Sequence, residues 1–235
     1  MPVAIARTPR GTAARYAIRS DTSDGALVGG IVEEDEYGLA FLPELTGWAI
    51  DVGAHIGTVA VALAMDHPGL RVVAVEALPE NVAVLRETVR LNGLEDRVFV
   101  HHAAAAKAGE REVAITYGWE RADNQPDEYM HDNRFIGGMV GANETSRSVV
   151  CQALSLAAIL DQYAIDRVAL LKIDCEGCEW FFLDSPEVGR IDRILGELHW
   201  GKHGGAKEFR ALLEPTHTIE LDDTLVVAHF DAVAR

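Results

Sequence analysis

The fold is decided by the stretch Trp48-Ala49-Ile50-Asp51-Val52-Gly53-Ala54-His55-Ile56-Gly57-Thr58. A short apolar run ends at the acid Asp51, glycines follow it, and a segment rich in alanine and valine comes next. This order predicts a buried strand, a tight turn and a helix that begins at about Thr58. Gly53 allows a sharp reversal and the close approach of a ligand, and Gly57 allows the helix to pack closely. The helix N-terminus offers free N–H groups to the same turn.

A second short apolar strand, Arg71–Val75, ends in Glu76, which lies 25 residues after Asp51. In nucleotide-binding α/β sheets, an acid about 20 residues past the glycine turn binds ribose hydroxyls. The turn is neither G-x-G-x-x-G nor a P-loop, and no lysine follows its glycines to neutralise phosphates. These features favour a positively charged adenosyl ligand without phosphates, S-adenosylmethionine, over an NAD-linked dehydrogenase. The alternative is an ordinary strand–helix–strand unit whose acids are incidental.

Strands and helices alternate along most of the remaining chain. A helix is expected from Pro79 to Leu91, and it ends at Asn92-Gly93. Further strands are expected at 97–103, 168–174 and 191–199. This alternation predicts a parallel, doubly wound sheet with ligands at the carboxyl ends of its strands.

Two regions depart from this regularity. Residues 1–47 are expected to form an N-terminal arm and cap that precede the main domain, 48–235. Strands at Glu112–Tyr117 and Ser148–Leu154 flank the segment 118–147, which is rich in glycine, asparagine, aspartate and aromatic residues. Because a loop of this length is usually functional or disordered, we expect a substrate-side lid, with a loop of no consequence as the alternative.

The amino-acid composition limits the classes of molecule that the protein is expected to bind. The 235 residues are 49% hydrophobic and 25% charged, which suits one globular domain. The net charge of −16 disfavours DNA or RNA as a substrate but would not repel amines. No run approaches the ~20 apolar residues of a membrane span, and the N-terminus lacks the apolar part of a secretory signal. With three cysteines, these features predict a cytoplasmic, reduced protein without membrane contact.

Four parts of the chain resemble the FkbM family of class I S-adenosylmethionine-dependent methyltransferases. They are Asp51–Gly57, Val75–Asn81, Leu91–Leu94 and Leu171–Glu179. Most members of the family methylate hydroxyl oxygens of sugars and natural products, and Lys172–Gly177 is the most specific part of the resemblance. The family commonly has asparagine where this chain has His55, and the expected lid matches nothing in it.

The resemblance implies an α/β, Rossmann-like class I methyltransferase fold. Its mostly parallel seven-stranded sheet would carry helices on both faces and an antiparallel last strand at about Thr224–Phe230. Asp51 and the backbone of Gly53–Gly57 would hold the methionine part of the cofactor, and Glu76 the ribose. The expected cofactor residues are Asp51, Gly53, His55, Gly57, Thr58, Glu76, Ala77, Ala103, Ala104 and Asp174, with the two alanines beside the adenine. The partner would be a small molecule, and a homodimer stays open.

Methyl transfer to a hydroxyl requires alignment and a group that removes a proton. The candidates are Asp174, Glu176 and Glu179 after the fourth strand, and Glu197 and His199 at the end of the fifth. An ordinary histidine pKa suits His199 as the base, although a role in substrate binding is as well supported. Glu197 lies two residues before His199 on a strand, so it should point to the same side and could orient the ring. Helix capping is the alternative for Glu176 and Glu179.

Two groups of residues in the sequence have side chains of the kinds that bind metals. A divalent metal held by Asp174, Glu197 and His199 suits hard oxygen ligands plus one imidazole, but nothing in the spacing demands it and none is predicted. Cys175 and Cys178 form a C-x-x-C pair, yet zinc needs a second pair of ligands and the third cysteine stands alone. We therefore interpret that pair as incidental to the turn.

The sequence thus predicts a methyltransferase that acts on a hydroxyl oxygen of a small molecule, such as a sugar, an aminoglycoside or a polyketide. One alternative is an amine or carboxylate acceptor, which should tolerate the loss of His199. Another is a non-catalytic nucleoside-binding protein. The acids Asp51, Glu76 and Asp174 argue against the second alternative, although they indicate binding better than turnover.

Overall fold

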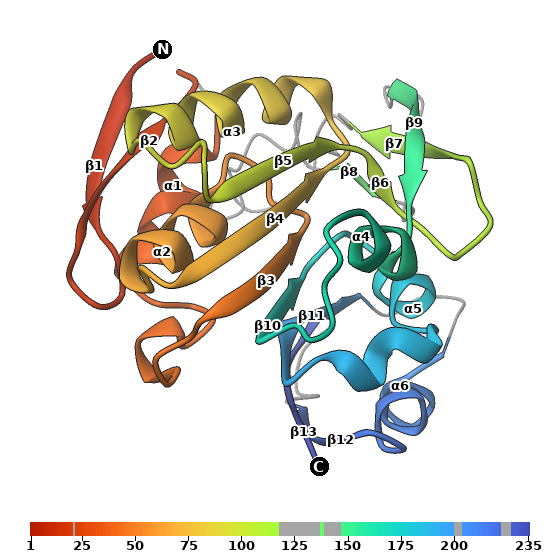
Figure 1. Ribbon diagram of the computed structural model, residues 1–235. Coiled ribbons are helices and arrows are strands. Elements are labelled where there is room, and N and C mark those ends of the chain that lie inside the picture. Colours follow the sequence, from red (N-terminus) through yellow and green to blue (C-terminus); the bar gives the residue numbers. More distant parts are fainter. Residues whose placement is uncertain (21, 118–136, 139–146, 200–203, 222–226) are drawn as a thin grey trace, which may run out of the picture.

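The computed structural model describes residues 1–20, 22–117, 137–138, 147–199, 204–221 and 227–235. Its centre is a seven-stranded sheet with helices packed on both faces (Figure 1). None of the helices in these segments has the length and hydropathy needed to cross a bilayer.

The strand order in the sheet is β12-β13-β11-β10-β3-β4-β5. The bounds are β3 Gly47–Val52, β4 Leu70–Glu76, β5 Val98–His102, β10 Leu170–Ile173, β11 Arg193–His199, β12 His217–Leu221 and β13 Val227–Ala234. Strand β13 runs antiparallel to both of its neighbours, and the other pairs in this sheet are parallel. The predicted fold class and the antiparallel last strand are therefore confirmed. Because β4 and β10 flank β3 on opposite sides, the strand order reverses there, which is where ligands bind in such sheets.

The helices divide between the two faces of the sheet. The bounds are α2 Thr58–Asp66, α3 Pro79–Leu91, α4 Leu156–Gln162, α5 Glu179–Phe182, α6 Ala206–Leu213 and the 3₁₀ helix η5 Pro186–Arg190. Residues of α2 and α3 share one hydrophobic core, and residues of α4, α5 and α6 share the other. The side chains of successive strand residues point to opposite faces of the sheet. Ala49 of β3 packs in the core with α2 and α3, and Ile50 packs in the core with α4, α5 and α6.

The first 47 residues pack on the α2–α3 face. They form the antiparallel hairpin β1 (Val3–Arg7) and β2 (Ala13–Ala17), and then α1 (Asp24–Leu27), the π-helix η1 (Val28–Glu33) and the 3₁₀ helix η2 (Leu39–Phe41). Tyr16 is fully buried in the core that α2 and α3 share. The Ala17 N–H donates to Thr88 Oγ1 of α3 at 3.2 Å. The segment expected to be an arm is thus a hairpin fixed to α3.

A second, smaller sheet lies beyond β5. It has the order β6-β9-β7-β8, with bounds β6 Ala104–Ala105, β7 Glu112–Tyr117, β8 Gly137–Gly138 and β9 Arg147–Leu154. Strands β7 and β9 correspond to the two strands that the sequence predicts here, and they pair antiparallel. The predicted lid, 118–147, falls outside the described residues except for β8 and the first residue of β9.

Candidate active site

A cavity of about 260 Å³ opens at the carboxyl ends of the central strands. Eight of the expected cofactor residues line it: Gly53, His55, Thr58, Glu76, Ala77, Ala103, Ala104 and Asp174. Asp51 lies fully buried in β3, and Gly57 is the N-cap of α2, so neither of them forms the cavity wall. Among the acceptor-side candidates, Glu176 and Glu197 line the cavity together with Asp174, whereas His199 does not.

Glu76 holds the turn that follows β3. Its carboxylate accepts hydrogen bonds from the His55 N–H at 2.9 Å, the Leu78 N–H at 2.8 Å and Asn81 Nδ2 at 3.2 Å. Burial raises the pKa of Glu76, and these donors oppose that rise. The carboxylate is therefore fixed at the cavity wall, at the end of β4.

The two glycines and His55 shape the turn itself. A Cβ on Gly53 would lie 1.7 Å from the Asp174 carbonyl oxygen, so glycine is required where β3 and β10 converge. A Cβ on Gly57 would lie 2.5 Å from Leu85 Cδ1, so this glycine lets α2 pack against α3. His55 has a left-handed φ of 48°, which asparagine adopts more readily than most residues.

The ring of His55 has no hydrogen-bond partner within the described residues, although both of its nitrogens are buried. Burial lowers the pKa of His55 to about 4, against the opposing effect of Asp24. The ring is therefore neutral near pH 7 and contributes two unsatisfied polar atoms beside the cavity.

Lys172 joins the two strand-end acids. It is 3% exposed on β10, and its Nζ lies 3.6 Å from Asp51 Oδ1 and 3.8 Å from Asp174 Oδ2. The same Nζ donates to the Gly53 carbonyl at 3.1 Å. Burial lowers the pKa of Lys172, but the surrounding carboxylates outweigh this and raise it. Tyr37, from the N-terminal cap, donates its hydroxyl to Asp174 Oδ2 at 2.8 Å.

His199 is oriented by Glu179 and not by Glu197. Its Nδ1 lies 3.1 Å from Glu179 Oε1, whereas Nε2 lies 3.3 Å from Glu176 Oε2 and 3.9 Å from Glu197 Oε2. Glu179 is fully buried and also accepts from the Cys175 N–H at 2.9 Å, so it fixes the turn as well as the ring. The shared direction of Glu197 and His199 is as predicted, but the orienting carboxylate comes from α5.

The pKa values of His199, Glu176 and Glu197 differ from those that these side chains have in water. Burial lowers the pKa of His199, but the bond to Glu179 and the charges of Glu176 and Asp174 raise it to about 10 overall. Burial raises the pKa of Glu176 to about 7. Burial, with the charge of Asp174, raises that of Glu197 to about 8. The ordinary histidine pKa used in the sequence argument therefore does not hold in the folded chain.

Cys175 and Cys178 form a disulfide with a Cα–Cα distance of 5.5 Å. The prediction of a fully reduced protein is thus wrong for this pair. Glu176 and Gly177 between them take left-handed φ values of 57° and 107°, so the chain reverses and brings the two cysteines together. The third cysteine, Cys151, is free and buried.

Sequence reasoning missed Lys172 and Tyr37 as parts of the site, and it named Glu179 as a candidate without its role in orienting His199. Lys172 carried a signal, because a lysine inside an apolar strand must meet buried acids. Tyr37 carried none, since it is 137 residues from its partner Asp174.

Comparison with known proteins identifies the family. Residues 51–221 match the methyltransferase FkbM domain. The chain belongs to the FkbM methyltransferase family. No curated protein matches its sequence.

Three solved structures are similar to this chain at low sequence identity. Streptococcus pneumoniae Sp1610, assigned as a tRNA (m1A22) methyltransferase, is 12% identical with a TM-score of 0.50, over 87% of this chain and 70% of that one. The C-terminal domain of precorrin-6Y C5,15-methyltransferase from Rhodobacter capsulatus is 10% identical with a TM-score of 0.49, over 94% of each chain. M. capricolum TrmK, solved with S-adenosylhomocysteine, is 9% identical with a TM-score of 0.48. The match covers 83% of this chain and spans 65% of TrmK.

The cofactor of this FkbM methyltransferase is S-adenosylmethionine, and the cavity fits it. Ala77, Ala103 and Ala104 give an apolar wall suited to adenine. Carboxylates at the other end suit the positive sulfonium.

Proposed function

We propose that this methyltransferase acts on a hydroxyl oxygen of a small molecule, such as a sugar, an aminoglycoside or a polyketide-type natural product. The main support is a wall of carboxylates: Asp174, Glu176 and Glu197 line the same cavity as the cofactor turn. An alcohol is a poor nucleophile until its proton is removed, so it is the acceptor that needs such groups most.

In the proposed reaction the acceptor oxygen attacks the methyl carbon. The carbon–sulfur bond breaks, sulfur keeps the electron pair, and the hydroxyl proton passes to the site. The cofactor supplies the activated methyl group, and the chain supplies alignment and proton removal. We assign the methionine part to the backbone of Gly53–Gly57, which Asp51 supports from behind through Lys172. We assign the ribose to Glu76 and the adenine to the wall of Ala103 and Ala104.

We assign proton removal to the carboxylates Asp174, Glu176 and Glu197, and we assign to His199, which holds a proton near pH 7, the balancing of their charge. The three carboxylates reach the cavity directly, and His199 stands behind them on Glu179. Asp174 borders Gly53 and so adjoins the methyl end of the cofactor. An amine acceptor is the second candidate, because the same carboxylates would attract a cation; they would repel a carboxylate acceptor.

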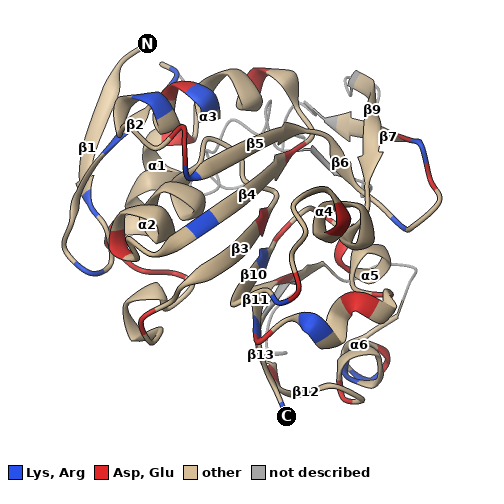
Figure 2. Cartoon of the chain, viewed as in Figure 1, with Lys and Arg blue, Asp and Glu red and all other residues tan. Residues whose placement is uncertain are grey.

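The expected partners belong to this proposal. A small-molecule substrate, without nucleic acid or a membrane, suits the net charge of −16 and the spread of lysines and arginines over several elements of the described chain (Figure 2). We keep the cytoplasmic location as a prediction, and the homodimer stays open.

Calorimetric titration with S-adenosylmethionine and S-adenosylhomocysteine tests the cofactor site. Micromolar binding, about −8 kcal/mol, should be lost in Asp51→Ala and Glu76→Ala. The matched control Glu95→Gln removes an exposed acid and should bind normally. Folded protein that binds neither nucleoside would overturn the assignment.

Methyl transfer from labelled cofactor to paired alcohols and amines of one scaffold tests the acceptor. The proposal requires label on oxygen and a large loss of kcat in Glu176→Gln or Glu197→Gln. Label on nitrogen alone, with both variants active, would favour the amine.

A further inference from the structure

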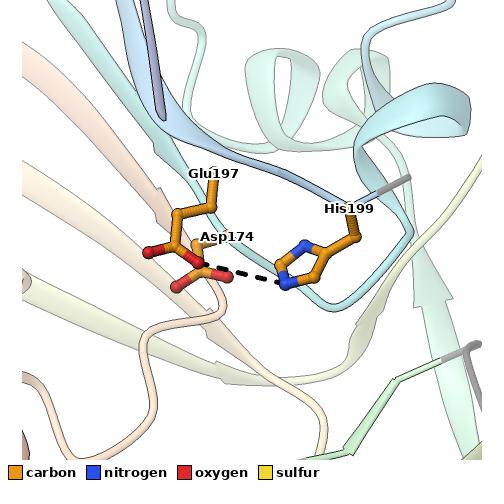
Figure 3. A group of neighbouring side chains, drawn as sticks. All are labelled: Asp174, Glu197 and His199. Carbon is orange, nitrogen blue, oxygen red and sulfur yellow. Dashed lines mark ion pairs between the residues drawn. The ribbon is translucent and has the colours of Figure 1, made fainter. Parts of the chain in front are cut away.

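We propose that Asp174, Glu197 and His199 form a binding site for a divalent cation, Mg²⁺ or Mn²⁺ (Figure 3). Asp174 follows β10, and the other two residues stand on the neighbouring strand β11. One ligand atom from each residue lies within 4.8 Å of the other two. Opposite ligands of an octahedral Mg²⁺ are about 4.2 Å apart, twice the metal–oxygen distance, so small side-chain shifts close the site.

The imidazole of His199 is already held by a carboxylate from behind. Glu179 Oε1 lies 3.1 Å from Nδ1, so Nε2 faces the other acids, at 3.3 Å from Glu176 Oε2 and 3.9 Å from Glu197 Oε2 (Figure 3). A carboxylate behind a ligating histidine is the usual arrangement in metal sites. Glu179 is fully buried, and its Oε1 also accepts from the Cys175 N–H at 2.9 Å, so the carboxylate is held in place behind the ring.

One carboxylate oxygen of Asp174, Oδ1, can act as a ligand to the ion. The contacts from Tyr37 and Lys172 both go to Oδ2, which leaves Oδ1 for an ion. The side chains of Asp174, Glu197 and His199 are 24%, 18% and 11% exposed, so an ion can reach them from the cavity.

The charge balance favours a cation. Five carboxylates gather here, and the ammonium group of Lys172 faces two of them; an ion bound at His199 Nε2 would replace the proton that this ring otherwise carries. The five are Asp51, Asp174, Glu176, Glu179 and Glu197. Oxygen ligands with one imidazole suit Mg²⁺ or Mn²⁺ better than soft metals.

An ion here would polarise an acceptor hydroxyl and ease the loss of its proton. That use rests on the proposed hydroxyl acceptor, whereas binding of the ion does not.

The test is titration of the full chain with Mn²⁺ alone, followed by electron paramagnetic resonance. Wild type should bind one Mn²⁺ with a nitrogen coupling from imidazole. Glu197→Gln should weaken binding at least 10-fold, and His199→Gln should remove the nitrogen coupling. The positioning variant Glu179→Gln should weaken binding about 10- to 100-fold. Glu95→Gln should bind as wild type does.

Absence of bound Mn²⁺ at millimolar concentration in wild type, or equal binding by Glu197→Gln, overturns the proposal. Separate titration with S-adenosylhomocysteine shows whether each variant keeps its fold and its cofactor site. A protein that binds nucleoside but not Mn²⁺ therefore refutes the metal site alone.

Discussion

Replacing Lys172 with methionine should destabilise the protein strongly. The two side chains are similar in length, so Lys172→Met removes the charge with little change in packing. Asp51 would then be fully buried without the ion pair at 3.6 Å that Lys172 gives it. Breaking a buried pair on one side costs about 3–5 kcal/mol.

The charge on Asp51 sets the size and the pH dependence of this effect. Protonating an ordinary carboxyl at pH 7 costs about 4 kcal/mol, and at pH 5 about 1.5 kcal/mol. The variant can fold with Asp51 protonated. The cost of that protonation is therefore the upper limit on the stability lost through the unpaired charge at each pH. The folded-state pKa of Asp51 would stand above its unfolded value, and the variant should regain stability as the pH falls.

Urea denaturation at pH 7 and pH 5, followed by tryptophan fluorescence and circular dichroism, measures both quantities. Asp51→Asn combined with Lys172→Met should recover most of the loss, because no unpaired charge remains. Lys107→Met removes a lysine from an exposed ion pair and should unfold as wild type does. A deficit below about 1 kcal/mol at pH 7, or one that does not shrink at pH 5, would refute the role given to Lys172.

Three further predictions concern packing and protonation. Gly53→Ala should fail to fold or lose cofactor binding, since its Cβ would lie 1.7 Å from the Asp174 carbonyl, whereas Gly109→Ala, with open space around it, should fold; a well-folded, binding Gly53→Ala contradicts this. Phe209→Ala should cost about 3–5 kcal/mol in urea, because the ring is fully buried against Trp180 and Phe230; a loss under about 1 kcal/mol would show that the core refills. Burial lowers the pKa of His217 in the folded chain. Below about pH 6.5 the unfolded chain therefore binds a proton at His217 more readily than the folded chain does, and the free energy of unfolding decreases as the pH is lowered. His217→Gln should flatten that fall between pH 7 and pH 5, by up to about 1.4 kcal/mol per pH unit, and parallel curves would disprove the assignment.

The order of elements and the cofactor side of the site could be predicted from the sequence because their signals are local. Each of these signals depends on residues that are close in the sequence. They are the apolar run before Asp51, the glycine turn and the acid at Glu76. Strand alternation then constrains the sheet, because parallel strands need crossovers of one hand. The matching cavity wall, from Gly53 to Ala104, follows from those local signals.

The acceptor side depended on tertiary structure. Tyr37 reaches Asp174 from the cap, and Glu179 takes the orienting role that strand spacing had given to Glu197. The pKa of His199 rises because the acids between β10 and the start of α5 meet its ring, and the spacing of residues along β11 does not encode that approach. The sequence by itself thus determined the fold and the cofactor turn, where the decisive contacts are near in the chain. Only folding decided how the distant charges balance, because electrostatic energy depends on distance in space and on burial.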